Sequence, residues 1–142
     1  MSTLNFPDVN VWLALIWERH PHAAEAYNWF EAAREEQFWF CRFTQISVLR
    51  LLTTESVLGR DAQTLAGAWE LWDRVRADDR IGCLPEPERL EHFFRTFSSA
   101  ITRSPKVWAD AYLLGFAAAA GLQLVTFDRA LKTRGGPDVL LL

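Results

Sequence analysis

The chain has little of what several classes of protein require. Its 142 residues include two cysteines, Cys41 and Cys83, which lie in short apolar runs without the spacing of metal ligands. We expect both to be reduced, buried and inert. No serine stands in a nucleophile-elbow pattern and no Gly-rich phosphate loop is present, since Gly135-Gly136 precedes Pro137 and is typical of a turn. These absences argue against cysteine-based metal sites, serine hydrolases and phosphate-loop proteins.

Hydrophobic runs and positive charge are also limited. The longest apolar run, Ala111–Leu122, is too short to span a bilayer. The segment Met1–Asp8 lacks the basic and apolar regions of a secretory signal peptide, so a cytoplasmic protein with no membrane association is the expectation. With 15 basic and 18 acidic residues the net charge is −3. Binding to nucleic acid would therefore need a local basic patch or metal ions.

Hydrophobic residues are plentiful, at half of the chain, with seven Trp and ten Phe, so we expect one globular domain over residues 1–142. Strand patterns alternate with helical patterns. This alternation predicts an α/β domain with a central parallel sheet of about four to five short strands, flanked by helices on both faces. The expected strands are 4–7, 37–41, 81–84, 122–125 and 139–142. The expected helices are 9–17, 21–34, 45–53 with Thr44 as N-cap, 62–76, 87–97, 107–120 and 129–132.

One carboxylate lies in an apolar stretch. The helix expected over Val107–Ala120 is apolar almost all round, as in a helix packed inside a core, yet it contains Asp110. No basic residue lies three or four positions after Asp110, and only Lys106 lies four positions before it. An ionised carboxylate in such surroundings normally has a partner or a metal ion.

Two further carboxylates follow strands. Asp8 comes after the first expected strand and Asp128 after the fourth. The carboxyl ends of parallel strands share one edge of a sheet, so these acids should converge there with Asp110. Mg²⁺ or Mn²⁺ would remove their mutual repulsion, and such a site suits phosphodiester hydrolysis. A structural alternative stays open, because Asp8 and Asp128 also stand where helix N-caps occur.

Three segments carry a resemblance to a known family. Pro7–Asn10, Trp108–Leu113 and Leu124–Leu131 together resemble the PIN domain, specifically VapC-type toxins of type II toxin–antitoxin pairs. The resemblance implies a Mg²⁺-dependent endoribonuclease, with Mn²⁺ as a possible substitute, that cleaves RNA of the tRNA or rRNA class and inhibits translation. It also implies neutralisation by a VapB-type protein antitoxin, a homodimer, and products with a 5′-phosphate and a 3′-hydroxyl. By match to the family motifs, the metal-binding and catalytic carboxylates would be Asp8, Asp110 and Asp128.

The resemblance also implies supporting polar groups and shows one departure. Asn10 and Thr126 would lie near the metal or its water. The family usually has an acid, commonly Glu, near the start of the helix after the second strand, where this chain offers only the neutral Gln45. Glu55 would lie about 15 Å further along a helix and is a poor substitute. We therefore expect one tightly bound ion rather than two.

The basic residues near the C-terminus are candidates for RNA contacts. If a metal neutralises Asp110 and Asp128, this end of the chain becomes a positive rim able to hold phosphates. The residues expected to bind RNA are Arg103, Lys106, Arg129 and Lys132. A solvated scatter of surface charge is the alternative.

Other functions remain open at this point. His20 and His22 flank Pro21 at a helix break, which indicates an exposed loop rather than a metal site. The missing acid at Gln45 leaves room for a non-catalytic PIN-like interaction module. A phosphatase of the haloacid-dehalogenase type also begins with an Asp after its first strand, but it needs a second Asp where this chain has Asn10.

Overall fold

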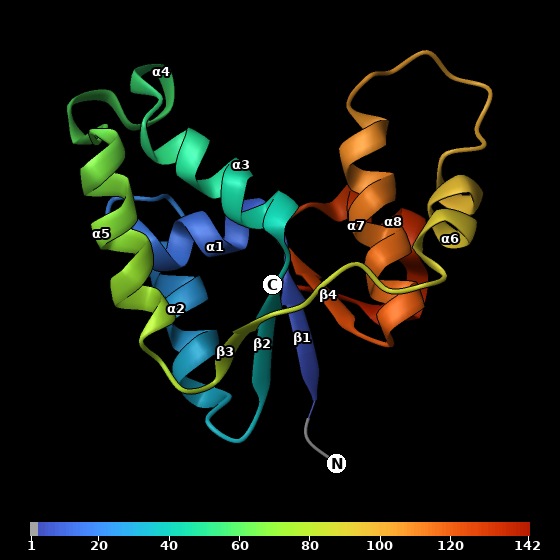
Figure 1. The fold of residues 1–142 in the computed structure, drawn as a ribbon, viewed down its shortest axis with the longest axis horizontal. Coiled ribbons are helices and arrows are strands. Elements are labelled where there is room, and N and C mark those ends of the chain that lie inside the picture. Colours follow the sequence, from blue (N-terminus) through green and yellow to red (C-terminus); the bar gives the residue numbers. More distant parts are fainter. Residues whose placement is uncertain (1–2) are drawn as a thin grey trace.

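The computed structural model describes residues 3–142 and contains one sheet of five parallel strands in the order β3-β2-β1-β4-β5. Met1 and Ser2, the start of the segment predicted not to be a signal peptide, lie outside the described residues. The strands are β1 (Leu4–Pro7), β2 (Gln37–Phe40), β3 (Ile81–Cys83), β4 (Gln123–Thr126) and β5 (Val139–Leu141). Strand β1 is central and pairs with β2 on one side and β4 on the other (Figure 1). The predicted parallel sheet is confirmed.

Eight α-helices connect and cover the strands within residues 3–142. They are α1 (Val9–Ile16), α2 (Ala23–Ala32), α3 (Arg42–Leu52), α4 (Glu55–Leu58), α5 (Leu65–Arg76), α6 (Leu90–Phe97), α7 (Val107–Ala120) and α8 (Arg129–Gly135), with 3₁₀ turns η1 (Gly59–Asp61) and η2 (Gly136–Asp138). None of these helices is long and apolar enough to cross a membrane.

The start of α3 differs from the prediction. The helix begins at Arg42 with Cys41 as its N-cap, so Thr44 is the third helical residue rather than the cap. The Thr44 hydroxyl accepts a hydrogen bond from the Cys41 amide (2.9 Å) and donates one to the Cys41 carbonyl (2.8 Å). These reciprocal bonds stabilise the first turn, which explains why a threonine stands three residues inside the helix.

The start of α5 also differs. The predicted helix 62–76 begins only at Leu65, where the Thr64 hydroxyl accepts a hydrogen bond from Gly67 (3.0 Å). The chain before it forms α4 and η1, which were not predicted. Cys83 is exposed, contrary to the prediction, because it ends the edge strand β3; Cys41 is buried as predicted.

Helices cover both faces of the sheet and make two hydrophobic cores. The first core joins α1, α3 and α5 to β2, and includes Trp12, Phe40 and Trp72. The second joins α7 and α8 to β1 and β4, with Phe6 stacked on Phe116 at 4.8 Å between ring centroids. Figure 1 shows α5 and α6 far apart on opposite sides of the strands. The sheet therefore lies between two packed halves, and its carboxyl edge runs between them.

Candidate active site

Asp8 is the most buried carboxylate at the carboxyl edge of the sheet, with 8% exposed surface. It is the N-cap of α1, and its Oδ1 accepts a hydrogen bond from the Val11 amide at 3.0 Å. Burial raises the pKa of Asp8 to about 6, against the opposing effect of hydrogen bonds from Thr126 and Val11. The negative charges of Asp110 and Asp128 raise the pKa of Asp8 further.

Thr126 links two of the predicted carboxylate segments. It is the last residue of β4, is fully buried, and donates its hydroxyl hydrogen to Asp8 Oδ2 at 2.5 Å. The hydroxyl oxygen of Thr126 in turn accepts a hydrogen bond from the Asp128 amide at 2.9 Å. Because Asp8 also donates its amide to the Val125 carbonyl (2.9 Å), the chain after β1 is fixed against the end of β4. Thr126 thus lies in direct contact with Asp8, beside the site predicted for it.

Asp128 has a capping role as well as its place at the sheet edge. It is the N-cap of α8, and its Oδ1 accepts hydrogen bonds from Ala130 (2.8 Å) and Leu131 (3.3 Å). The structural alternative is therefore correct for both Asp8 and Asp128: each stabilises a helix N-terminus. Both capping bonds of Asp128 go to Oδ1, so Oδ2 lies outside them on an exposed side chain.

Asp110 lies in the first turn of α7, is half-buried, and has a basic partner that was not predicted. Arg134, from the end of α8, donates to Asp110 Oδ2 at 3.4 Å and to the Phe97 carbonyl at 3.3 Å. Burial raises the pKa of Asp110, Arg134 lowers it, and Asp128 raises it. The search for a partner along the helix missed Arg134 because the contact joins residues 24 positions apart.

The three predicted carboxylates thus share one region. The negative charges of Asp110 and Asp128 raise the pKa of Asp8, and the charge of Asp128 raises the pKa of Asp110. Within residues 3–142, no three His, Cys, Asp or Glu side chains stand so that they could hold a metal ion as a group. The donor chemistry still fits Mg²⁺, which prefers oxygen ligands and usually keeps several waters while using one or two carboxylates. The oxygen donors present are therefore of the kind that suits an ion that keeps part of its hydration shell.

Asn10 and Gln45, the predicted amide groups, have other partners. Asn10 is exposed near the start of α1, and its Oδ1 lies 2.8 Å from Nε2 of His20. Gln45 is buried on α3 and accepts a hydrogen bond from Arg42 through Oε1. Among the described residues, Gln45 makes no hydrogen bond to the three carboxylates. Glu55 is exposed at the start of α4 and provides no replacement acid.

His20 differs from its prediction as an exposed loop residue. It is buried, with 8% exposed surface, and burial followed by the nearby His22 lowers its pKa. Sequence reasoning found the helix break at Pro21 but not that the chain folds back against Asn10 and Phe127. Predicting this contact from the sequence would have required knowing where β4 ends relative to α1.

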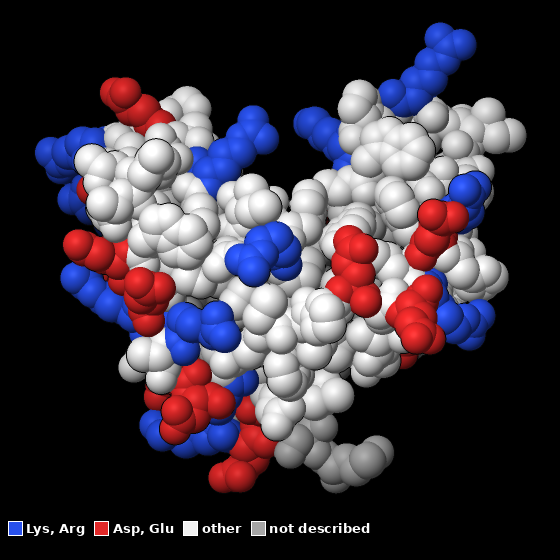
Figure 2. Space-filling model, viewed as in Figure 1, with Lys and Arg blue, Asp and Glu red and all other residues white. Residues whose placement is uncertain are grey.

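The basic residues predicted to bind RNA fall into two groups. Arg103, Lys106 and Arg129 are exposed. Lys132 instead donates to the carbonyls of Gly136 (3.0 Å) and Val139 (2.5 Å), which fixes the segment between α8 and β5. Figure 2 shows a hollow between the half of the molecule that carries α3 and α5 and the half that carries α6 and α7, with Lys and Arg side chains on both rims.

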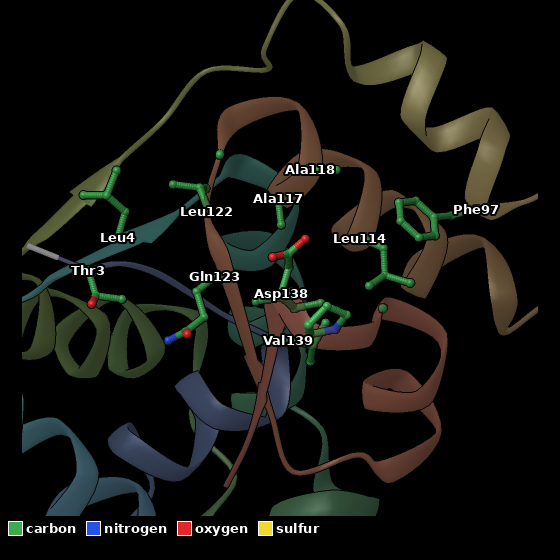
Figure 3. A pocket seen from close by; sticks show the side chains of 14 residues that line it. Thr3, Leu4, Phe97, Leu114, Ala117, Ala118, Leu122, Gln123, Asp138 and Val139 are labelled. Atoms are coloured by element: carbon green, nitrogen blue, oxygen red, sulfur yellow. The ribbon is translucent and has the colours of Figure 1, made fainter. Parts of the chain in front are cut away.

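A separate cavity of about 380 Å³ lies at the other end of the sheet (Figure 3). Its lining includes Leu4 and Gln123 from the starts of β1 and β4, together with Leu114 and Ala117 of α7. None of the three carboxylates lines it. The candidate site is therefore the carboxyl edge and not this cavity.

Comparison with known proteins identifies the family. A model of the PIN domain matches residues 6–136. The chain is 40% identical over 140 residues to Ribonuclease VapC41 from Mycobacterium tuberculosis, covering 95% of this chain and 96% of VapC41. Two solved structures share the fold. VapBC2 from Rickettsia felis, bound to a DNA fragment from their promoter, has a TM-score of 0.71 and 12% identity, and the match covers 99% of this chain and 98% of that one. VapC20 from Mycobacterium tuberculosis, a Sarcin-Ricin loop cleaving toxin, has a TM-score of 0.69 and 15% identity, with 96% of this chain and 98% of that one covered. This chain belongs to the PIN domain family, as a VapC-type member.

Proposed function

We propose that the protein is a metal-dependent endoribonuclease toxin that hydrolyses RNA phosphodiester bonds and so inhibits translation. The observation that carries the proposal is the convergence of Asp8, Asp110 and Asp128 at the edge where β1 and β4 end, where the charges of Asp110 and Asp128 raise the pKa of Asp8. The 40% identity to a ribonuclease over nearly the whole chain supports the same reaction.

In this proposal Asp8, Asp110 and Asp128 hold a hydrated Mg²⁺, which Mn²⁺ can replace. When bound, the ion would lower the pKa of water and stabilise negative charge on the phosphate. Thr126 orients Asp8 through its hydrogen bond to Oδ2, and the capping bonds orient Asp128. Arg134 holds the Asp110 carboxylate and reduces the repulsion around it.

The remaining partners follow from the surface and from relatives. Three basic residues are exposed and can contact RNA phosphates: Arg103, Lys106 and Arg129. Lys132 instead stabilises the chain after α8 through its hydrogen bond to the Gly136 carbonyl. A protein antitoxin is proposed because the fold matches the VapBC2 complex, and a homodimer because the family resemblance implies one. VapC20 is a Sarcin-Ricin loop cleaving toxin, and the family resemblance implies RNA of the tRNA or rRNA class, so a mixed pool of both is the substrate to test first.

The test is cleavage of a mixed tRNA and rRNA pool by the antitoxin-free protein, with Mg²⁺, with EDTA, and with Asp110→Asn. Asp73→Asn, on the exposed face of α5, is the matched control. We expect discrete fragments that need both the metal and Asp110, and that persist in the control. Cleavage that survives EDTA or Asp110→Asn would contradict the proposed site.

Two observations favour a different function, that of a non-catalytic interaction module. Gln45 replaces the usual acid and its carbonyl oxygen is occupied by Arg42, and no three-ligand metal group is present within residues 3–142. Folded protein that binds an antitoxin but cleaves no RNA at any Mg²⁺ concentration would establish that function instead.

A further inference from the structure

His20 has one hydrogen-bonding arrangement that fixes the position of its proton. Its Nδ1 accepts a hydrogen bond from the His22 backbone amide at 3.0 Å. A ring nitrogen that accepts cannot carry the proton, so in neutral His20 the proton is on Nε2. Nε2 then donates to Asn10 Oδ1, 2.8 Å away. Both ring nitrogens are thereby satisfied, as a buried imidazole requires.

The bond to His20 decides which way the Asn10 amide faces. An unrestrained amide can turn over and present either its oxygen or its NH₂ group. Here Oδ1 is held by His20, so Asn10 can offer only the two hydrogens of Nδ2 to other groups. Asn10 is exposed and stands two residues after Asp8, on the first turn of α1. The helix that begins after Asp8 therefore carries an oriented neutral donor in its first turn.

The aromatic rings of Trp17 and Phe127 pack against the His20 ring. The His20 ring meets Trp17 edge-on, at 5.8 Å between centroids. Phe127, which lies between Thr126 and Asp128, is nearly parallel to His20 at 6.5 Å and stacks on His22 at 4.5 Å. His20 therefore packs against the segment that carries Asp128, while its Nε2 contacts the helix that follows Asp8.

We propose that His20 is a positioning residue that holds the Asn10 amide with its NH₂ group directed at a phosphate oxygen of the RNA bound at the carboxylates. The inference rests on the proposed function. A neutral NH₂ donor complements an anionic phosphate, whereas a carbonyl oxygen would repel it. The arrangement also removes the Asn10 carbonyl from the oxygens available to a metal ion.

The test is a double-mutant cycle with RNA cleavage as the readout. His20→Leu fills the buried position with an apolar side chain and removes the donor, and Asn10→Ala removes the amide. We expect each variant to lower kcat by about tenfold to hundredfold, as supporting groups of metal sites do, and the double variant to lose no more than Asn10→Ala alone. His20→Gln supplies an amide donor at a similar reach and should recover most of the activity.

Controls separate positioning from stability. His92→Leu, at an exposed position of α6, makes the same substitution away from the site and should leave kcat unchanged. Assays run well below each variant's melting temperature exclude unfolding. Losses that multiply in the double variant, or a His20→Gln variant as impaired as His20→Leu, would overturn the proposal.

A second readout does not depend on cleavage. Nuclear magnetic resonance of the Asn10 side-chain NH₂ should show an ordered amide in the wild type and a mobile one in His20→Leu, and the nitrogen shifts of His20 should show a protonated Nε2. Equal order in both proteins would refute the positioning role. If the wild type cleaves no RNA while the amide still depends on His20, the proposed function fails and the positioning contact stands.

Discussion

At the scale of single residues, Asp8 stabilises the fold as the N-cap of α1 but destabilises it as a buried negative charge. Its pKa of about 6 lies above the 3.8 of an unfolded aspartate, so the folded state binds the proton more tightly. Stability should therefore fall as the pH rises from about 4 to 6, by about 3 kcal/mol for this group. Asp8→Asn keeps an N-cap without the charge. We expect it to raise the free energy of unfolding at pH 7.5 in EDTA by about 1–3 kcal/mol, measured with urea.

That gain should shrink as the pH approaches 4, where the wild-type Asp8 is protonated in the folded state. Asp73→Asn, at an exposed position, should give no such pH-dependent gain. A variant less stable than the wild type at pH 7.5 would mean that the hydrogen bonds from Thr126 and Val11 outweigh the cost of burial.

The sequence predicts residues that follow strands better than it predicts their partners. Asp8 and Asp128 could be selected because a parallel sheet gathers strand ends at one edge, and Asp110 because it is a lone carboxylate in an apolar helix. The contact of Arg134 with Asp110 could not, because it depends on how α8 packs beside α7. The partners of Lys132 were not predictable either: the sequence predicts that Lys132 contacts RNA, and the structure shows that its ammonium group donates to the backbone carbonyls of Gly136 and Val139.

At the scale of elements, the crossing of α6 over α7 depends on Gly115. A Cβ built there would lie 2.7 Å from the Phe94 amide nitrogen and 2.9 Å from its Cα, both backbone atoms that cannot turn aside. Gly115→Ala should therefore push α6 away from α7 and destabilise the protein by about 1–3 kcal/mol, despite the better helix propensity of alanine. Thermal unfolding measures the effect.

Gly67→Ala on α5 is the matched control. Its nearest neighbour would be the end of the flexible Gln63 side chain at 2.8 Å, which can move. We expect little loss of stability or a gain of up to about 1 kcal/mol from helix propensity. Equal destabilisation by the two substitutions would contradict the prediction, because it would show that the close approach of the Phe94 backbone to Gly115 has no special cost.

The bounds of α7 were predictable, whereas the start of α5, also a long helix, was not. The apolar run of α7 and its stop at Gly121, a left-handed position with φ of 68°, predicted the bounds that the structure shows. Short elements were not predictable in the same way. Helix α4 has four residues and no periodicity to detect, and α3 starts three residues early because Thr44 bonds back to Cys41.

At the scale of the whole molecule, alternating strands and helices predicted a parallel sheet with both faces covered, but not the strand order that places β1 between β2 and β4. That order sets Asp8 beside Thr126, because Pro7 pairs with Val125. It also leaves a hollow between the two halves, with basic side chains on its rims (Figure 2). A net charge of −3 conceals this local arrangement.

The exposed basic residues between α6 and α7 give a prediction about salt. RNA binding measured in EDTA, which keeps the RNA intact, should weaken linearly in log K against log salt concentration. Neutralising Arg103 and Lys106 together, as Arg103→Gln with Lys106→Gln, should weaken binding and reduce the slope by about 0.7 for each phosphate that the protein no longer neutralises. Both residues are exposed in the segment between α6 and α7, so the fold should be unaffected.

Arg34→Gln is the matched control for this measurement. Arg34 is exposed after α2, near the amino ends of the strands and away from the carboxylates, where it pairs with Glu31 at 3.0 Å. Its neutralisation should leave the salt slope unchanged if RNA is held at the carboxyl edge. If Arg34→Gln reduces the slope as much as the paired substitution, RNA binding does not depend on Arg103 and Lys106 in particular, and the prediction is wrong.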